Sequence, residues 1–266
     1  TISSAGTYTL SGLLSNGMIY VDASDDDTVE LDLNNVNLTS DSNSIIWANN
    51  ADKLKIKALE GTSNLIKDTR STKTSDNDTQ GEGAIYSKCD LSLVGKGTLI
   101  VSSTYNNGIH GSDDLSIKNQ TLQVTAANNA LKGNDSVSIE SGKIALYSQG
   151  GDGIKTSASD VSSKGNQRGT ITITGGVVNV NAYFDGLDAA YNVEISNEAE
   201  LLIKTGSFST YGKASTSYSQ KGIKADNEID ISNGTVEVYA TDDAIHANYG
   251  ESLENGSKGL GNINIS

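Results

Sequence analysis

The sequence predicts an all-β fold: a right-handed, single-stranded parallel β-helix with about 22–24 residues and three short strands in each coil. Two observations lead to this prediction. A short phrase of polar, small and aliphatic residues recurs along the chain, and apolar and polar residues alternate between its copies. Stacking the copies in parallel places every inward aliphatic side chain in one continuous core.

The recurring phrase places an aliphatic residue, here called the anchor, after a polar residue and a small one. Examples are Asn107-Gly108-Ile109, Asp152-Gly153-Ile154 and Asp185-Gly186-Leu187. Four of the six intervals between successive anchors span 22–24 residues, and the two longer intervals contain polar inserts. The anchors are Ile85, Ile109, Leu131, Ile154, Leu187, Ile223 and Ile245. We therefore assign one coil to each phrase.

Two strand-like segments follow each anchor. Leu91-Ser92-Leu93 leads to Thr98–Val101, and Ile171-Thr172-Ile173 leads to Val177–Val180 across the turn Gly175-Gly176. Alternation of this kind indicates strands with one buried face. A sandwich or barrel would need hairpin-connected strands without this period, and the abundance of Gly, Ser, Thr and Asn disfavours helices.

We expect residues 1–266 to form a single β-helix domain. We predict irregular coils and an N-terminal cap for residues 1–60, with Trp47 at the N-terminal end of the core. For residues 80–266 we predict regular coils. Polar inserts are expected at 68–80, 157–167 and 206–219. The last strand-like segment, 263–266, ends in the middle of a coil, so a downstream segment, an anchoring segment or a partner is expected to cover that edge.

Charge and composition restrict the partners. The chain has 19 basic and 33 acidic residues and a net charge of −14, which disfavours nucleic acid and anionic membranes. No segment approaches the roughly 18 apolar residues of a membrane span, so membrane insertion is not expected. Cys89 is the only cysteine, which excludes an internal disulfide. The N-terminal residues lack Met, a basic segment and an apolar run, so we expect a mature chain without its targeting peptide.

Stacking turns each position of the phrase into a column of side chains, and one column is rich in acids. Asp152, Asp185 and Asp188 are expected to meet, with Asp160 folding over them from an insert. A second candidate site gathers Asp226, Asp242 and Asp243. Stacked carboxylates repel and favour a cation, and calcium takes such oxygen ligands. The alternative is that Asx-Gly pairs form tight turns, in which Gly supplies a positive φ.

A lysine column and two tyrosines lie beside the acids. Lys132, Lys155 and Lys224 follow their anchors directly, and Tyr105 and Tyr183 lie in the adjacent turns. The lysines either meet the carboxylates of an acidic polysaccharide or balance the neighbouring aspartates. Tyrosine rings stack on sugar faces. We therefore take these five residues as candidate carbohydrate-binding residues.

Several of these phrases resemble a bacterial carbohydrate-binding β-helix family of cellulose-degrading bacteria. They are Tyr105–Ile109, Gly151–Lys155, Asp242–Ala247 and Gly169–Gly176. The resemblance implies a protein of the cell surface, calcium in the coil turns, binding of cellulose and polygalacturonate-like sugars, and structural kinship with pectate lyases. It carries calcium ligation to Asp152, Asp185 and Asp243. Asn107, Asn129 and Lys221 depart from the pattern.

The sequence and the resemblance together predict a secreted, calcium-binding, non-catalytic protein that recognises plant cell-wall polysaccharide. The alternative is a calcium-dependent pectate lyase that cleaves polygalacturonate by β-elimination, with Lys155 or Lys224 as the base. The only arginines, Arg70 and Arg168, lie in inserts rather than in the columns. A third hypothesis is an adhesin in which calcium only stiffens the rod.

Overall fold

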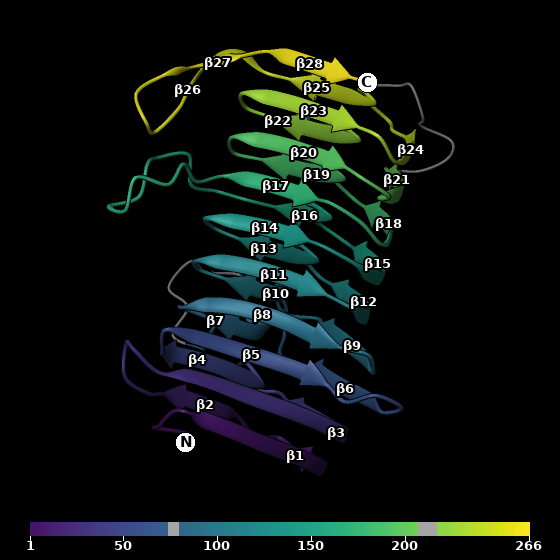
Figure 1. Cartoon of the computed structure of the whole chain (residues 1–266). Helices are drawn as coiled ribbons and strands as arrows, with labels where there is room; N and C mark the ends of the chain where they lie inside the picture. Colours follow the sequence, from purple (N-terminus) through teal and green to yellow (C-terminus); the bar gives the residue numbers. More distant parts are fainter. Residues whose placement is uncertain (74–79, 207–216) are drawn as a thin grey trace.

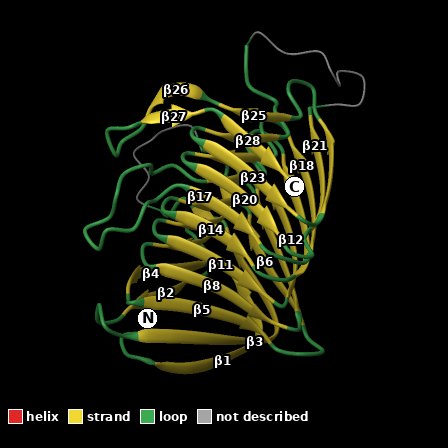
Figure 2. Ribbon diagram, turned by 45° about the horizontal axis from the view of Figure 1, so that its top comes forward, coloured by secondary structure: helices red, strands yellow, loops and turns green. Residues whose placement is uncertain are grey.

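The computed structural model describes residues 1–73, 80–206 and 217–266 and contains no helix in those ranges. Its strands wind into a parallel β-helix that rises from the N-terminal coil to the C-terminal coil (Figure 1). Three faces, here named A, B and C, each stack strands in parallel, and the chain visits them in this order in each regular coil (Figure 2). The right-handed parallel β-helix predicted from the sequence is confirmed.

Face A is a nine-stranded sheet, while faces B and C are joined into a 17-stranded sheet by two long strands. Face A comprises β2 (Ile19–Asp22), β4 (Ile46–Asn50), β7 (Gly83–Ser87), β10 (Asn107–Gly111), β13 (Leu131–Gly133), β16 (Ile154–Lys155), β19 (Leu187–Ala189), β22 (Ile223–Ala225) and β25 (Ile245–Ala247). Face B comprises β5 (Lys53–Ala58), β8 (Asp90–Gly95), β11 (Asp114–Lys118), β14 (Ser136–Ile139), β17 (Thr170–Ile173), β20 (Asn192–Ser196), β23 (Glu228–Ser232) and β28 (Asn262–Ile265). Face C comprises β6 (Ser63–Asp68), β9 (Thr98–Ser103), β12 (Gln120–Ala126), β15 (Gly142–Ser148), β18 (Val177–Ala182), β21 (Glu200–Thr205) and β24 (Thr235–Tyr239).

The two joining strands lie in the N-terminal coils. β1 (Gly6–Ser15) pairs in parallel along β3 (Thr28–Ser40), and β3 pairs first with β5 on face B and then with β6 on face C. Near the other end, β26 (Tyr249–Ser252) and β27 (Lys258–Leu260) form an antiparallel pair. The long strands β1 and β3 therefore start the stack, and the β26–β27 pair lies beside the last coils of the β-helix (Figure 1).

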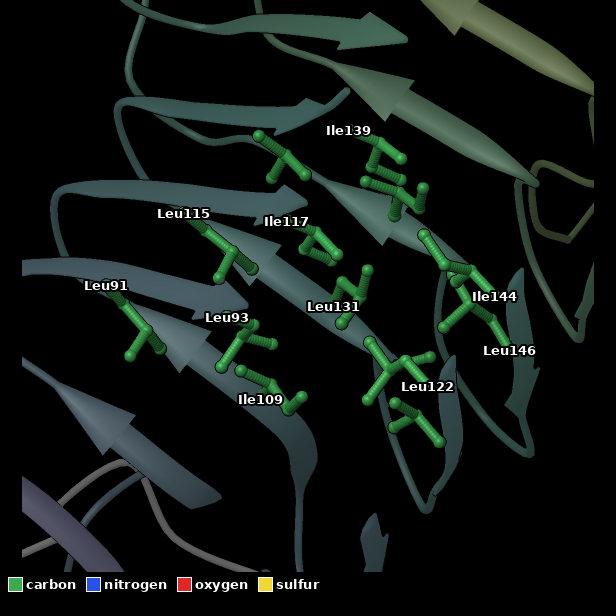
Figure 3. Packing of buried hydrophobic residues seen from close by; sticks show 14 of the residues in the cluster. Leu91, Leu93, Ile109, Leu115, Ile117, Leu122, Leu131, Ile139, Ile144 and Leu146 are labelled. Atoms are coloured by element: carbon green, nitrogen blue, oxygen red, sulfur yellow. The ribbon is translucent and has the colours of Figure 1, made fainter. Parts of the chain in front are cut away.

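The anchors align in one ladder along face A. Ile109 pairs with Leu131 and Leu131 with Ile154, and the same register extends N-terminally through Ile85 to Ile46 and Ile19. The inward residues of all three faces pack against this ladder, as Figure 3 shows for the central coils. Burial of each such Leu or Ile contributes about 1.5–3 kcal/mol relative to exposure.

The glycines that precede the anchors are required by packing rather than by backbone conformation. Gly108, Gly153, Gly186 and Gly222 are absent from the residues with positive φ. A Cβ at any of them would lie 2.1–2.3 Å from a γ-methyl group of an inward residue on face C. The interpretation of the Asx-Gly pairs as positive-φ turns is therefore wrong. Positive φ occurs instead at Asn and Gly residues of other turns, such as Asn119 between faces B and C.

The residues that follow the anchors form an outward column on face A. In its N-terminal part, Tyr20, Trp47, Tyr86 and His110 stack with ring centroids 5.3–5.8 Å apart. Trp47 therefore lies on the outer side of the sheet, and its assignment to the core is wrong. The alternation of β4 explains this, because Ile46 and Ala48 point inward and Trp47 does not.

The 157–167 insert leaves the helix between β16 and β17 and contacts the turn between β26 and β27. The Ser159 N–H donates to the Glu254 carboxylate at 2.8 Å, and the Asn255 amide donates to Gln167 Oε1 at 2.8 Å. The other two inserts connect face C to face A, and their residues 74–79 and 207–216 lie outside the described residues.

Candidate functional site

A ladder of buried Asx side chains lines the corner where face C turns into face A. Each side-chain oxygen accepts the backbone N–H of the equivalent residue in the next coil. Asn129 Oδ1 accepts the N–H of Asp152 at 2.8 Å, and Asp152 Oδ1 accepts the N–H of Asp185 at 3.0 Å. Asp185 Oδ1 then accepts the N–H of Lys221 at 2.6 Å. This bonding explains why both Asn and Asp occur at this position, since both offer the required oxygen.

Three acids of this corner come together as an acidic triad, defined by Asp152, Asp185 and Asp188. One oxygen from each lies within 4.8 Å of the others, and all three residues are at least 92% buried. Asp152 and Asp185 belong to the Asx ladder, whereas Asp188 projects from β19 directly after the anchor Leu187. The sequence prediction that these three carboxylates meet agrees with this geometry.

Two lysines of the predicted column neutralise part of the triad. The Lys155 ammonium contacts Asp152 Oδ2 at 2.9 Å and also pairs with Asp188 Oδ2, while Lys224 contacts Asp188 Oδ1 at 2.9 Å. Burial opposes ionisation of Asp188, but the two ammonium groups outweigh it and hold its pKa below the usual value. The same contacts outweigh burial at Lys155 and Lys224 and raise both pKa values.

Asp185 keeps an uncompensated charge. Burial is the largest cause that raises its pKa, to about 6, and the carboxylates of Asp188 and Asp152 add to it against hydrogen bonds from Lys221 and Ser219. Burial likewise raises the pKa of Asp152. Three buried carboxylates facing two ammonium groups leave a net negative charge, and their oxygens are the ligands that hard cations prefer. The residues of the triad therefore fit a divalent cation.

A cleft of about 600 Å³ lies along the same corner, on the N-terminal side of the triad. It is polar, and it is formed by four successive coils, from that of Ile85 to that of Ile154, and by the first insert. Its lining residues are Thr72, Lys73, Glu82, Tyr105, Asn106, Asn107, Ala127, Asn128, Asn129, Lys132 and Gly150. The cleft therefore contains two of the predicted carbohydrate-binding residues, Lys132 and Tyr105.

Lys132 differs from the other two lysines of its column. Burial lowers its pKa, and the carboxylate of Glu82 only partly compensates. Glu82 is engaged elsewhere: it contacts His110 at 3.3 Å and Lys73 at 3.4 Å, and the His110 contact is the main cause that lowers its pKa to about 2. Among the described residues none forms an ion pair or hydrogen bond with the Lys132 ammonium. Lys132 therefore offers the cleft a cation suited to an anionic ligand.

A buried arginine holds one wall of the cleft. Arg70 makes a two-pronged ion pair with Asp68, at 2.7 and 3.0 Å, and donates to the carbonyl oxygens of Gln80 and Gly81. Its guanidinium lies 3.9 Å from the centroid of the Tyr105 ring. Arg70 thus fixes the base of the insert and orients Tyr105.

The remaining predicted metal ligands are not brought together. Asp160 lies in the insert and pairs with Arg168 at 3.4 Å. Asp242 pairs with Lys221 and Asp243 with His246, both at 2.8 Å, while Asp226 accepts from Asn248 at 2.6 Å. In the described ranges, Asp152, Asp185 and Asp188 are the only group of metal-ligating side chains this close together.

Sequence reasoning missed the residues that the inserts contribute. Lys73 and Arg70 come from the first insert, and Tyr218 comes from the described residues 217–219 of the third. Because inserts carry no period, no column could place them.

Within residues 1–73, 80–206 and 217–266, no helix is long and apolar enough to cross a membrane.

Comparison with known proteins shows the family. A family model described as carbohydrate-binding domain-containing protein matches residues 1–262. The chain belongs to this family. It is also 34% identical over 126 residues to a carbohydrate-binding domain-containing protein of Acetivibrio thermocellus, a match that covers 47% of this chain and 44% of that protein. The match thus spans less than half of that relative's length.

A solved structure extends the family likeness to the whole fold. The polysaccharide lyase-like protein from C. thermocellum, determined as a gadolinium derivative, has a TM-score of 0.70 and 31% sequence identity to this chain. The match covers 89% of this chain and 86% of the other. This carbohydrate-binding family member therefore shares its fold with a polysaccharide lyase-like protein, as the resemblance implied.

Proposed function

We propose that this protein binds plant cell-wall polysaccharide without cleaving it, through the cleft and the acidic triad. The expected ligands are acidic chains such as polygalacturonate, and cellulose. We further propose that it acts outside the cell, as a secreted or surface-attached protein. The observation that carries the proposal is the cleft itself, where a lysine without an ion-pair partner among the described residues lies beside amide side chains and an oriented tyrosine ring.

Each group of the cleft matches a part of an acidic sugar. The Lys132 ammonium suits a uronate carboxylate, since a partly desolvated cation binds an anion more strongly than an exposed one. The side chains of Asn106 and Asn128 suit hydroxyl groups, because amides both donate and accept hydrogen bonds. The Tyr105 ring suits the apolar face of a pyranose. Carbohydrate binding by the family supports this assignment.

Calcium is the proposed cofactor, held by Asp152, Asp185 and Asp188. A bound calcium ion would supply positive charge for the carboxylates of an acidic chain next to the cleft. In this chain the Lys155 ammonium lies where it contacts both Asp152 and Asp188, so it competes with a cation for the triad.

Binding without turnover is favoured over β-elimination by the state of the proposed bases. A lyase base must lose its proton near neutral pH. In the absence of a bound cation, the ion pairs with the triad raise the pKa values of Lys155 and Lys224, which keeps both lysines protonated. Among the described lysines, Lys132 has a lowered pKa, so it is the residue to test if turnover is found.

Affinity electrophoresis in polygalacturonate, with calcium or with chelator, tests the proposal. We expect calcium-dependent retardation, no rise in the absorbance of unsaturated products, and at least about a tenfold loss of affinity for Asp185→Asn. The control is Asp230→Asn, at an exposed site on face B. A calcium-dependent absorbance rise that Lys132→Met abolishes would replace binding by lyase activity. Absence of retardation on this polymer and on cellulose would refute the proposal.

A further inference from the structure

Three aromatic rings gather on the far side of the acidic triad from the cleft. This aromatic cluster consists of Tyr183, Phe184 and Tyr218, whose ring centroids lie 5.1–5.8 Å from one another. Tyr183 is 41% and Tyr218 45% exposed. Large apolar rings that gather yet remain open to water are typical of binding surfaces rather than of a core. The cluster is therefore suited to a ligand with an apolar face.

The cluster is tied directly to the triad. Tyr183 and Phe184 immediately precede Asp185, and Tyr218 precedes Ser219, whose hydroxyl donates to Asp185 Oδ1 at 2.8 Å. The side-chain amide of Gln220 donates to the Tyr183 carbonyl at 2.7 Å. The rings and the triad thus belong to one hydrogen-bonded unit at the corner between faces C and A.

The cluster is also aligned with the cleft along the helix axis. Tyr105 and Tyr183 occupy the same position of the phrase, four residues before the anchors Ile109 and Leu187. The two coils between them have Ala127 and Gly150 at that position, and both small residues line the cleft. Coils are stacked about 4.8 Å apart, so the two tyrosines are separated by about 14 Å. An aromatic residue therefore stands at each end of a row with small residues in its middle.

We propose that the aromatic cluster is a second stacking subsite, which binds the apolar face of a pyranose ring at the far end of an oligosaccharide lying along the helix axis. The proposal rests on the proposed function and adds the direction of the chain: from Tyr105 and Lys132, across the triad, to Tyr183 and Tyr218. The ligand is an oligosaccharide of several sugars with carboxylates in its middle portion. Shorter chains occupy the cleft alone.

Charge around the cluster supports a sugar over other ligands with apolar faces. Lys221, three residues after Tyr218, is paired with Asp242 at 2.8 Å, so its charge is compensated. The triad on the other side is strongly polar. A pyranose combines an apolar face with hydroxyl edges and fits this neighbourhood, whereas a fully apolar ligand would desolvate the triad at a high cost.

The test measures calorimetric affinity against chain length, using oligogalacturonides of two to eight sugars in calcium. For the unaltered protein we expect affinity to rise by about tenfold once the chain is long enough to reach the cluster. The variant Tyr183→Ala/Tyr218→Ala should bind short chains normally and lose this rise. The control is Tyr147→Ala, whose side chain is 50% exposed on face C, outside the corner.

The outcomes separate this inference from the proposed function. If the double variant keeps the full gain with chain length, the cluster is not a subsite, while binding in the cleft stands. If it weakens short and long chains equally, the direction assigned to the oligosaccharide is wrong. If the unaltered protein binds no chain of any length, the proposed function and this inference both fall. Circular dichroism of the variants confirms that the β-helix is intact.

Discussion

Lys155 sets the charge of the acidic triad. Its ammonium contacts two of the three carboxylates, at the place where a cation would bind both. A buried carboxylate deprived of its cation is costly, because its desolvation is no longer compensated. Lys155 therefore stabilises the triad, and a cation at the proposed calcium site would compete with it.

Replacement of this lysine tests the competition. Lys155→Met should increase the calcium affinity of the triad by about tenfold or more and destabilise the calcium-free protein by about 3 kcal/mol. Calcium titration calorimetry and thermal unfolding in chelator measure these effects, with the exposed Lys143→Met on face C as the control. Unchanged calcium affinity would show that Lys155 does not occupy the metal position.

The pKa of Asp185 predicts a pH dependence. The folded value of about 6 lies above the ordinary value of 3.8, so folding favours the protonated acid. Its stabilising contribution is therefore complete below about pH 4 and is lost as the pH rises through 6, by at most about 3 kcal/mol. The proposed calcium binding would release this proton, so calcium affinity should fall as the pH drops below 6.

Asp185→Asn isolates that contribution. In chelator, the difference in unfolding free energy between this variant and the unaltered protein should change between pH 4 and pH 7, in favour of the variant at the higher pH. Denaturant unfolding at a series of pH values measures the difference. A difference that is independent of pH would mean that Asp185 titrates normally.

At the scale of the element, each coil brings polar side chains to one corner and apolar side chains to the core. The small residue before each anchor makes this possible, because it lets face A approach face C. At Gly186, a Cβ would lie 2.3 Å from Ile203 Cγ2 and 2.5 Å from the Gly222 carbonyl oxygen. The same glycine lies between Asp185 and Leu187, and so its packing also positions the triad.

Gly186→Ala should destabilise the protein by about 1–3 kcal/mol, because overpacking forces shifts of the surrounding backbone. It should also weaken calcium binding, since Asp185 and Asp188 flank the site of the shift. The matched control is Gly111→Ala on the same face, where a Cβ would make only ordinary contacts at 3.7 Å or more. Equal stability of the two variants would contradict the packing argument.

The elements also show what periodicity could and could not predict. The coils and the triad were predictable, because one position of a repeat stacks on the same position in the next coil. Asp160 was misplaced since the conformation of an insert has no period, and it pairs with Arg168 instead. Asp242 and Asp243 failed to join Asp226 because Lys221 and His246 engage them. The packing role of the glycines that precede the anchors could not be predicted, because it depends on distances across the core.

For the whole molecule, the corner between faces C and A carries all the proposed binding features. The cleft, the triad and the aromatic cluster lie along it in successive coils. The outward column of face A changes character along the same direction, from the aromatic stack at Tyr20, Trp47 and Tyr86 to the lysines and Asp188. The stack would thus provide a rigid support for the proposed extended ligand.

Calcium should stabilise this support as a whole. At a concentration about 100 times the dissociation constant, a ligand of the folded state adds about 2.7 kcal/mol. For a chain of this size, that corresponds to an increase in Tm of roughly 5–10 °C. Scanning calorimetry in calcium and in chelator measures the shift, which Asp185→Asn should reduce strongly. An equal shift in that variant would place the stabilising ion elsewhere.

The most direct test of the account is calorimetric binding of an oligogalacturonide to the calcium-loaded protein. The unaltered protein and Lys143→Met should bind equally, whereas Lys132→Met and Asp185→Asn should each lose at least about tenfold in affinity, because one removes the cation of the cleft and the other a ligand of the metal. Equal binding by all four proteins would contradict the account and place the carbohydrate on another surface.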